Sequence, residues 1–177
     1  VYDIVLQSDG KFIICGDFTQ YNGAPRSGYA RINPNGTLDY SFTNIGINEY
    51  PYNYYYSVQD IEFLNNDKIV IAGNFLKGAN PNIKNIMCLN LDGSIRSVGF
   101  EQSGTTSAIY SMAKQSDGKL LVAGDFLGIH HYGNTRILRF YENASVDTTF
   151  GFAGTSTNEE VHAICAQPDG KILVGGN

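Results

Sequence analysis

The residues most suggestive of chemistry form an Asp-Gly-Lys motif that recurs along the chain. Its first copy, Asp9-Gly10-Lys11, lies in the stretch QSDGKFIICGDF, and closely similar stretches return at 115–126 and 167–177. A glycine-rich loop followed by lysine can bind phosphate when it leads into the N-terminus of a helix. Here each copy leads instead into a β-branched, apolar run that is typical of a strand. The motif therefore predicts a turn between strands rather than a phosphate site.

Two other groups of residues could bind a metal ion. Asn33, Asn35 and Asp39 partly match a calcium-binding loop, but the glutamate that ends such a loop is absent, and the acidic positions change between copies. His130 and His131 are adjacent on an irregular stretch, without an acidic residue or a cysteine beside them. The sequence therefore predicts neither a metal site nor a cofactor.

An arginine and an aspartate lie symmetrically about a second turn. Arg31 and Asp39 are equally distant from Asn35 at the centre of this turn, so we expect them to face each other across a hairpin. The third copy keeps both members of the pair, as Arg139 and Asp147. The second copy changes both: Cys88 stands in place of the arginine, and Arg96 stands in place of the aspartate. Joint retention and joint loss predict an ion pair with a structural role. An isolated Arg–Asp pair is a poor catalytic set, so the chain is predicted not to be an enzyme.

These residues lie on elements that recur roughly every fifty residues. Each copy contains an apolar run, a turn, a β-branched run ending in glycine, a loop, a third run, a second turn and a fourth run. The runs have the length of strands, and no stretch keeps a helical period, so essentially no helix is expected. The glycine that ends the second run is expected to let a neighbouring backbone approach closely; it is assigned to Gly16, Gly73, Gly124 and Gly175.

The repeat predicts an all-β fold of four-stranded antiparallel blades, as in a β-propeller or a propeller-like repeat array. The predicted boundaries of the copies are 1–57, 58–108 and 109–160, followed by the first half of a fourth copy at 161–177. Propellers usually need about four to eight blades to close. Three and a half copies therefore predict a segment of a larger array, or a protomer that assembles with others.

The turns and the cysteines have structural interpretations. Asp-Gly between two strands predicts a type I′ turn, with positive φ at both central residues, and the second turn suits a three-residue loop with glycine in the left-handed conformation. The lysine after each first turn is expected to cap the blade edge at the solvent rim: Lys11, Lys68, Lys119 and Lys171. The cysteines are expected to be small buried hydrophobic residues: Cys15, Cys88 and Cys165.

The charge balance argues against nucleic acid as a partner. The 12 Lys and Arg residues are outnumbered by 17 Asp and Glu residues, which gives a net charge of −5. Binding to nucleic acid usually requires clustered basic residues. The apolar runs are far shorter than the roughly 18 residues needed to span a bilayer, so no membrane span is predicted either.

The motifs in combination resemble the delta-60 repeats of bacterial propeller-like proteins, over nearly the whole chain. The matching residues in the first copy are Ile4, Gln7, Asp9-Gly10-Lys11, Gly16, Phe18, Arg31-Ile32-Asn33, Gly36-Thr37-Leu38-Asp39 and Phe42. The second copy departs from the pattern at Asn66-Asp67, Cys88 and Arg96. Such repeats occur in large secreted or surface-attached bacterial proteins, often beside adhesion modules, and in some phage-related proteins. The resemblance implies a binding or scaffold role and no catalytic residue.

Antiparallel topology places the short, repeated turns at one end of each blade and the long, variable connections at the other. Variable loops on a rigid scaffold commonly carry recognition, so we predict binding at this second end. Tyrosines there would provide rigid contact area with a polar tip. The candidate residues on its three loops are Tyr21, Asn22 and Arg26; Tyr50, Tyr52, Tyr54, Tyr55 and Tyr56; and His130, His131 and Tyr132.

The leading hypothesis is a non-enzymatic extracellular or cell-surface scaffold for adhesion. Its predicted partners are a protein or glycan surface and further repeats of the same chain or of other protomers. The alternative is a structural segment of a phage or virion, such as part of a tail or fibre. An enzyme with a site assembled from propeller loops ranks third, because no catalytic set recurs.

Overall fold

The computed structural model describes residues 1–47, 56–64, 68–77, 80–96, 100, 105, 107–126, 135–150, 157 and 159–177, with the backbone alone at 76–77 and 80–83. These residues form small antiparallel sheets, with no α-helix among them. The predicted all-β fold is confirmed. The described residues also contain no helix that is long and apolar enough to cross a membrane.

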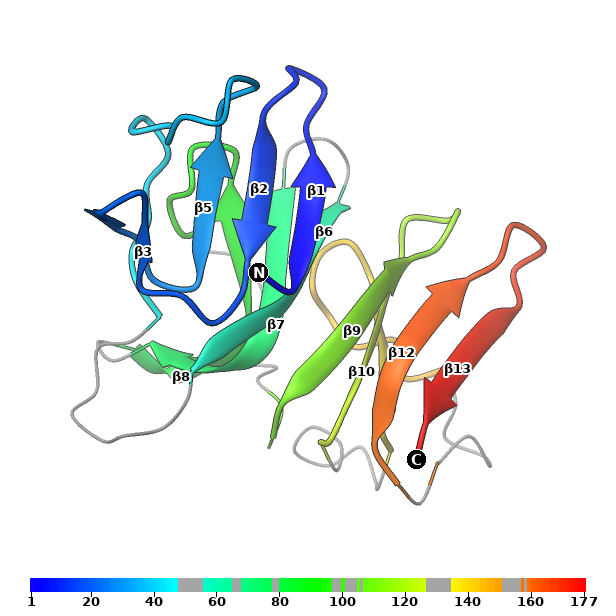
Figure 1. The fold of residues 1–177 in the computed structure, drawn as a ribbon. Coiled ribbons are helices and arrows are strands. Elements are labelled where there is room, and N and C mark those ends of the chain that lie inside the picture. Colours follow the sequence, from blue (N-terminus) through cyan, green and yellow to red (C-terminus); the bar gives the residue numbers. More distant parts are fainter. Residues whose placement is uncertain are drawn as a thin grey trace.

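Four sheets follow one another along the chain and stand side by side (Figure 1). The first contains β1 (Asp3–Leu6), β2 (Phe12–Cys15) and β5 (Tyr29–Ile32). The second contains β6 (Ser57–Leu64), β7 (Lys68–Lys77) and β8 (Asn80–Asn90). The third contains β9 (Ile109–Lys114), β10 (Leu120–Gly124) and β11 (Ile137–Phe140), and the fourth contains β12 (Val161–Ala166) and β13 (Ile172–Gly176). A two-stranded hairpin, β3 (Gln20–Tyr21) with β4 (Ala24–Pro25), leaves the first sheet.

The sequence predicted a fourth strand in each copy, and this is wrong for the first three copies, where the fourth run forms a single β-bridge. The bridges are Ile32 with Leu38, Leu89 with Ile95, and Phe140 with Val146. In the first copy the chain leaves the sheet because Asp39 bends it: the Asp39 carboxylate accepts a hydrogen bond from Ser41 N (2.9 Å), and Phe42 N donates to Asp39 O (3.3 Å). Such a side-chain to backbone bond competes with the ladder of a strand. Each of the first three blades therefore has three described strands and a short bridged segment.

The first turns differ from the predicted type I′ geometry. In the turn at 7–11 only Gly10 has positive φ (82°), whereas a type I′ turn would need it at Asp9 as well. Gly10 N donates to Gln7 O (3.0 Å) and Gln7 N donates to Lys11 O (2.8 Å), which defines a three-residue loop closed by a glycine bulge. The second turn at 33–37 has the same hydrogen bonds, with Gly36 in the left-handed conformation. One turn geometry therefore serves both hairpins.

The glycine after the second strand does admit a neighbouring backbone. A Cβ on Gly73 would lie 2.1 Å from Ser57 O, and one on Gly124 would lie 2.2 Å from Ala108 O. In the fourth copy the assignment to Gly175 is wrong. A Cβ on Gly175 would meet nothing within 4 Å, whereas one on Gly176 would lie 2.1 Å from Glu160 O. Gly176 follows Lys171 by five residues, the same offset that separates Lys11 from Gly16, Lys68 from Gly73 and Lys119 from Gly124.

Successive sheets pack face to face through their middle strands. In β7, Ile69 and Ile71 belong to the core shared with the first sheet, while Val70 and Ala72 belong to the core shared with the third. Because side chains alternate across a strand, a middle strand with a sheet on either side must be apolar at every position. This explains why the second run of each copy lacks a polar face.

The first strands of successive copies lie next to one another and are joined by hydrogen bonds. Ile61 N donates to Asp3 Oδ2 (3.1 Å), Met112 N donates to Asp60 Oδ2 (2.6 Å), and Ile164 N donates to Ser111 Oγ (3.4 Å). Burial raises the pKa of Asp60 to about 7, and the nearby Asp3 and Glu62 act in the same direction, against the hydrogen bond from Met112. The side chain at one position therefore links each copy to the backbone of the next.

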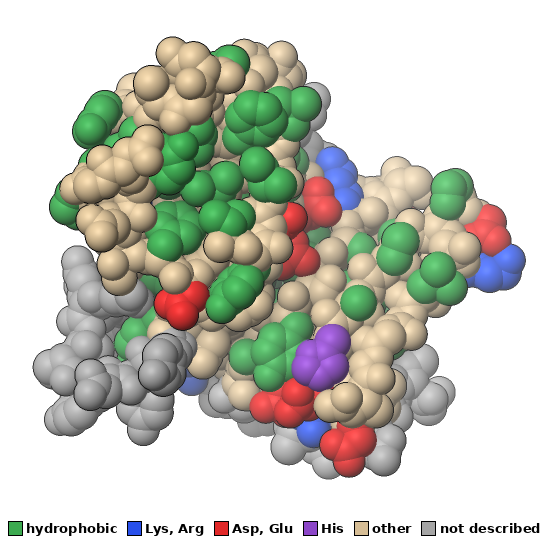
Figure 2. All heavy atoms as spheres, viewed as in Figure 1, with side chains coloured by type: hydrophobic (Ala, Val, Ile, Leu, Met, Phe, Trp, Pro, Cys, Tyr) green, Lys and Arg blue, Asp and Glu red, His purple; other side chains and the backbone are tan. Residues whose placement is uncertain are grey.

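The outer faces of the terminal copies carry exposed apolar residues, which Figure 2 shows gathered over the first sheet. Ile4 is 56% exposed, whereas its equivalent Ile61, covered by the preceding copy, is 2% exposed. In the fourth copy Leu173 is exposed and so is Cys165, contrary to the prediction that all three cysteines are buried. Cys165 is exposed because no sheet covers this face among the described residues.

Candidate functional site

The predicted ion pair of the first copy forms at the end of the sheets that carries the two turns, which we call the turn end. Arg31 Nε donates to Asp39 Oδ2 (2.8 Å), and Lys11 Nζ donates to the same oxygen (2.9 Å). Ser41 provides two further donors, its backbone N (2.9 Å) and its Oγ (2.6 Å), both to Oδ1. The Arg31 guanidinium also lies over the Phe42 ring, 4.6 Å from its centroid.

The surroundings of Asp39 fix its charge. Burial alone would raise the pKa of this carboxyl, but the hydrogen bonds from Ser41, Lys11 and Arg31 outweigh burial and hold the pKa well below its usual range. The lysine is thus more than the predicted cap at the solvent rim, because Lys11 contacts a buried carboxylate. An aspartate held this firmly as the anion is suited to a structural role.

The third copy repeats this arrangement. Arg139 Nε donates to Asp147 Oδ2 (3.0 Å), Tyr141 Oη donates to Oδ1 (3.0 Å), and Arg139 lies over the Phe150 ring at 4.3 Å. Burial raises the pKa of Asp147, but hydrogen bonds from Thr149, Tyr141 and Arg139 prevail and lower it to about 2. The two copies that retain the pair therefore use the same geometry.

The cations also reach the next copy. Arg31 Nη1 donates to Leu91 O (2.6 Å) in the second turn of the second copy. The second copy has Cys88 in place of this arginine, and there Lys68 Nζ donates to Glu142 O (3.3 Å) in the second turn of the third copy. Lysine thus replaces arginine in joining one copy to the backbone of the next.

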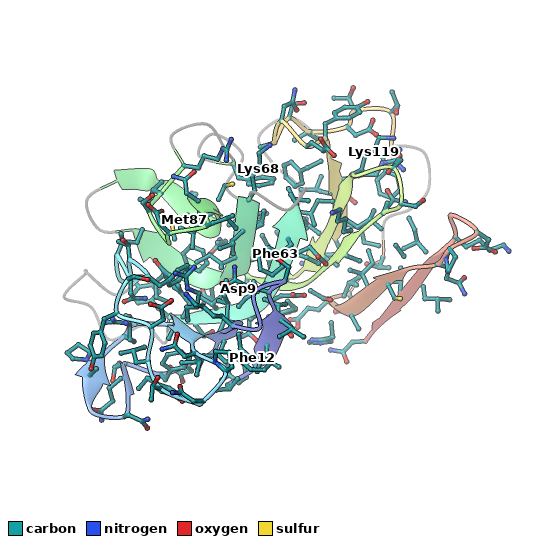
Figure 3. All side chains as sticks on the ribbon, turned by 90° about the horizontal axis from the view of Figure 1, so that it is seen from above. Asp9, Phe12, Phe63, Lys68, Met87 and Lys119 are labelled. Atoms are coloured by element: carbon teal, nitrogen blue, oxygen red, sulfur yellow. The ribbon has the colours of Figure 1, made fainter. Side chains whose placement is uncertain are left out.

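A groove lies at the turn end between the first and second copies. We call it the first groove; its volume is about 530 Å³ and it is lined by Leu6, Gln7, Ser8, Asp9, Arg31, Phe63 and Leu91. Figure 3 shows Asp9 and Phe63 close together at this joint. Gln7 Oε1 is buried and accepts no hydrogen bond from the described residues, since Arg31 is directed to Leu91 O. The equivalent Gln115 Oε1 accepts one from Arg139 Nη1 (3.4 Å). An acceptor without a partner is a place where a bound donor would gain a hydrogen bond.

A second groove lies at the equivalent place between the second and third copies. Its volume is about 480 Å³, and it is lined by Leu64, Lys68, Cys88, Asn90, Ile95, Arg96, Phe100, Glu142, Asn143 and Ala144. Leu64 and Phe100 are almost fully buried and form an apolar floor. The two grooves share one position in the repeat but have different linings.

The structure tests part of the three predicted binding loops. Tyr21 donates from its hydroxyl to Gly36 O (2.8 Å) and packs on the outer face of the first sheet, Asn22 lies at the tip of the β3–β4 hairpin with φ of 47°, and Arg26 donates to Pro25 O (2.7 Å). Tyr56 is buried in the core between the first two sheets, so it is wrong as a binding residue. The other candidates, Tyr50, Tyr52, Tyr54, Tyr55, His130, His131 and Tyr132, lie outside the described residues.

Sequence reasoning missed both grooves, since it placed recognition at the opposite end of the blades. Each groove is formed by residues far apart in sequence, such as Arg31 and Leu91, and no local pattern shows that they meet. One signal was available: the joint replacement of the Arg–Asp pair in the second copy marks the site where the second groove lies.

The arrangement suits binding better than proton transfer. A general acid or base works best when its pKa lies near the ambient pH. The hydrogen bonds around Asp39 and Asp147 instead lower the pKa of both carboxyls. Among the described residues, His, Cys, Asp and Glu form no group of three or more that could hold a metal ion.

The fold resembles that of solved extracellular domains. The extracellular domain of BT4673 from B. thetaiotaomicron, described as a hybrid two-component system, matches with a TM-score of 0.56 and 15% identity. A second structure, of the extracellular domain of BT4673 described as a one-component system, matches with a TM-score of 0.53 and 14% identity. Both matches cover 98% of this chain but 19% of the other, so the chain spans about a fifth of the proteins it resembles.

No curated protein sequence matches the chain. A family described as a domain of unknown function (DUF5122) with a β-propeller fold matches residues 7–42, 64–95, 115–150 and 167–177. Each segment holds the two turns of one copy, or the first turn in the last copy, and together they make up more than half of the chain. The chain therefore belongs to the DUF5122 β-propeller family.

Proposed function

We propose that the chain is part of an extracellular repeat scaffold that binds glycans, serves adhesion and catalyses no reaction. The observation that carries this proposal is the recurrence of a groove at one joint of the repeat with two different linings. Ligand-binding sites are typically formed by variable residues on a scaffold whose backbone is constant. The extracellular location is supported by the two BT4673 domains, which share the fold.

The lining of the first groove suits a sugar. Leu6, Phe63 and Leu91 provide apolar side chains, and Gln7 and Asp9 provide hydrogen-bonding groups beside them. A sugar ring has an apolar C–H face and polar hydroxyls, and small-ligand sites typically combine apolar walls with a few polar groups. A hydroxyl could also donate to the buried Gln7 Oε1, which has no partner in the described part of the chain.

A non-enzymatic role is supported by the protonation of the central carboxylates. Asp39 and Asp147 have lowered pKa values, so both stay ionised near neutral pH and cannot donate a proton there. Arg31 and Arg139 are already bound to these carboxylates. The groups that look most like a catalytic set thus stabilise the blade.

A glycan-array screen tests the proposal. Wild-type protein is expected to bind one or more glycans, and Leu91→Asn is expected to weaken that binding, because it removes an apolar wall of the first groove while its backbone oxygen still accepts from Arg31. Leu173→Asn is the matched control, since Leu173 is exposed on the opposite outer face. The proposal fails if no glycan binds above background, or if Leu91→Asn and Leu173→Asn bind alike.

The same screen tests one of the loops that the sequence predicts to bind a ligand. A variant with Tyr50, Tyr52, Tyr54 and Tyr55 changed to Ser tests the tyrosine-rich loop and leaves the buried Tyr56 intact. Reduced binding by this variant would extend the site to the other end of the blades. If no glycan is bound, the alternative of a phage or virion structural segment becomes the better proposal.

A further inference from the structure

The second groove differs from its counterparts in its charges. In the first and third copies an aspartate occupies the turn end beside arginine, and it is fully bonded there. In the second copy the aspartate position holds Arg96 and the arginine position holds Cys88, while the lysine of the first turn is kept as Lys68. The groove thus keeps cationic side chains but has lost the carboxylate that its own copy would supply.

Lys68 differs from the equivalent lysines of the first and third copies in its hydrogen-bond partner. Lys11 pairs with Asp39 (2.9 Å), and Lys119 pairs with Asp117 (2.7 Å). Among the described residues Lys68 pairs with no carboxylate, and its ammonium donates to the neutral carbonyl of Glu142 (3.3 Å). An ammonium has three donors, so Lys68 retains donors for an anion.

The lining of the second groove includes one carboxylate residue, Glu142, whose side chain is directed to the first turn of the third copy. Oε1 of Glu142 lies against Gly118 in the first turn of the third copy, where a Cβ on that glycine would be 2.3 Å away from it. Glu142 is exposed at this rim, and its contribution to the joint with the second copy is its backbone oxygen. Lys68 therefore brings to the groove a positive charge that no described carboxylate neutralises.

We propose that the second groove binds a sugar acid through its carboxylate, in the place where the first and third copies carry their own aspartate. Its volume of about 480 Å³ far exceeds the space of a side-chain carboxylate and lies within the roughly 300–1,000 Å³ of small-ligand sites. The carboxylate would accept from Lys68, and the ring would lie over the apolar floor of Leu64 and Phe100. The inference rests on the proposed function, that these grooves bind glycans.

Titration of the whole chain with tri-galacturonate and with neutral galactotriose tests this assignment. Tri-galacturonate is expected to bind about tenfold or more tightly than the neutral trisaccharide, because only the acid forms charge-assisted hydrogen bonds with the groove. Lys68→Gln is expected to weaken tri-galacturonate binding by about tenfold or more, while Lys119→Gln, at the equivalent position of the third copy, leaves it unchanged.

A double variant places a carboxylate of the protein where the carboxylate of the sugar acid is proposed to bind. Cys88→Arg with Arg96→Asp restores the Arg–Asp pair of the other copies and is expected to abolish tri-galacturonate binding. Thermal unfolding followed by far-UV circular dichroism verifies that this variant is folded. Sulfate at the concentration of the sugar is expected not to compete; competition would overturn the assignment to a carboxylate.

The outcomes separate this inference from the proposed function. If galactotriose and tri-galacturonate bind with equal affinity, and Leu91→Asn weakens this binding, the sugar-acid site is refuted and the first groove is supported as the glycan site. Tri-galacturonate binding that survives both Lys68→Gln and the double variant would refute the inference as well. If neither these sugars nor any glycan of the array binds, both proposals fail together.

Discussion

Replacing Asp147 by Asn should destabilise the protein in a manner that depends on pH. The side chain of Asp147 is 1% exposed, and its pKa is lowered from 3.8 to about 2. Because one pKa unit corresponds to about 1.4 kcal/mol, this shift is equivalent to about 2 kcal/mol of stability at neutral pH. Asn resembles the protonated acid in shape and charge, so Asp147→Asn should lower the free energy of unfolding by about this amount at pH 7.

The sign of the pH dependence follows from the direction of the shift. A lowered pKa in the folded state means that the ionised carboxylate stabilises the fold above pH 3.8, and that this stability is lost as the pH falls toward 2. The difference between wild type and Asp147→Asn should therefore shrink from about 2 kcal/mol at pH 7 to about 1 kcal/mol at pH 3.

Urea unfolding followed by tyrosine fluorescence measures this difference, since the chain contains 12 Tyr and no Trp. Asp169→Asn is the matched control: Asp169 pairs with Lys171 at an exposed turn, where such pairs contribute little. The reasoning is refuted if Asp147→Asn changes stability by less than about 0.5 kcal/mol at pH 7, the range of exposed pairs, or if its effect is equal at pH 7 and pH 3.

Three further outcomes are expected. Gly124→Ala should destabilise the protein by more than about 3 kcal/mol, because the new methyl group meets a backbone oxygen. Gly175→Ala should change stability by less than about 0.5 kcal/mol, because its methyl group meets open space. Equal effects of the two variants in urea unfolding would contradict the glycine assignment. A thiol reagent should modify Cys165 in the native protein and all three cysteines in urea; rapid native reaction of more than one thiol would contradict the described burial. Since the pKa of Asp60 is raised to about 7, wild-type stability should rise as the pH falls from 8 to 5, and Asp60→Asn should be less sensitive to pH over this range; an identical pH profile in the variant would remove Asp60 as the cause.

The features that the sequence predicted correctly are those with a local signature. Alternation and β-branching within short runs identify the strands, and the equal offsets of Arg31 and Asp39 from the centre of a turn identify the ion pair. Each of these patterns lies within about ten residues of chain, so the residues that interact can be read together.

The features that were missed depend on contacts between copies or on closely similar backbone states. Asp-Gly is compatible both with a type I′ turn and with a three-residue loop closed by a bulge, and the sign of φ at Asp9 decides between them. The glycine of the fourth copy is an exception, because Gly176 follows Lys171 by the same five residues as in the other copies and the offset alone identifies it. The grooves require Leu91 and Glu142 to meet the preceding copy, which only packing reveals.

Five hydrogen bonds between copies have a side chain on one partner and a main-chain atom on the other. The acceptors for Arg31 and Lys68 are the carbonyls of Leu91 and Glu142, and the aspartates and serine of the first strands bond amide nitrogens. Every residue except proline carries both of these main-chain groups. A copy can therefore be succeeded by any other copy with the same backbone, whatever its side chains at these positions. Such a junction tolerates duplication and reordering of units, and it leaves the outward-facing residues of each unit free to diverge.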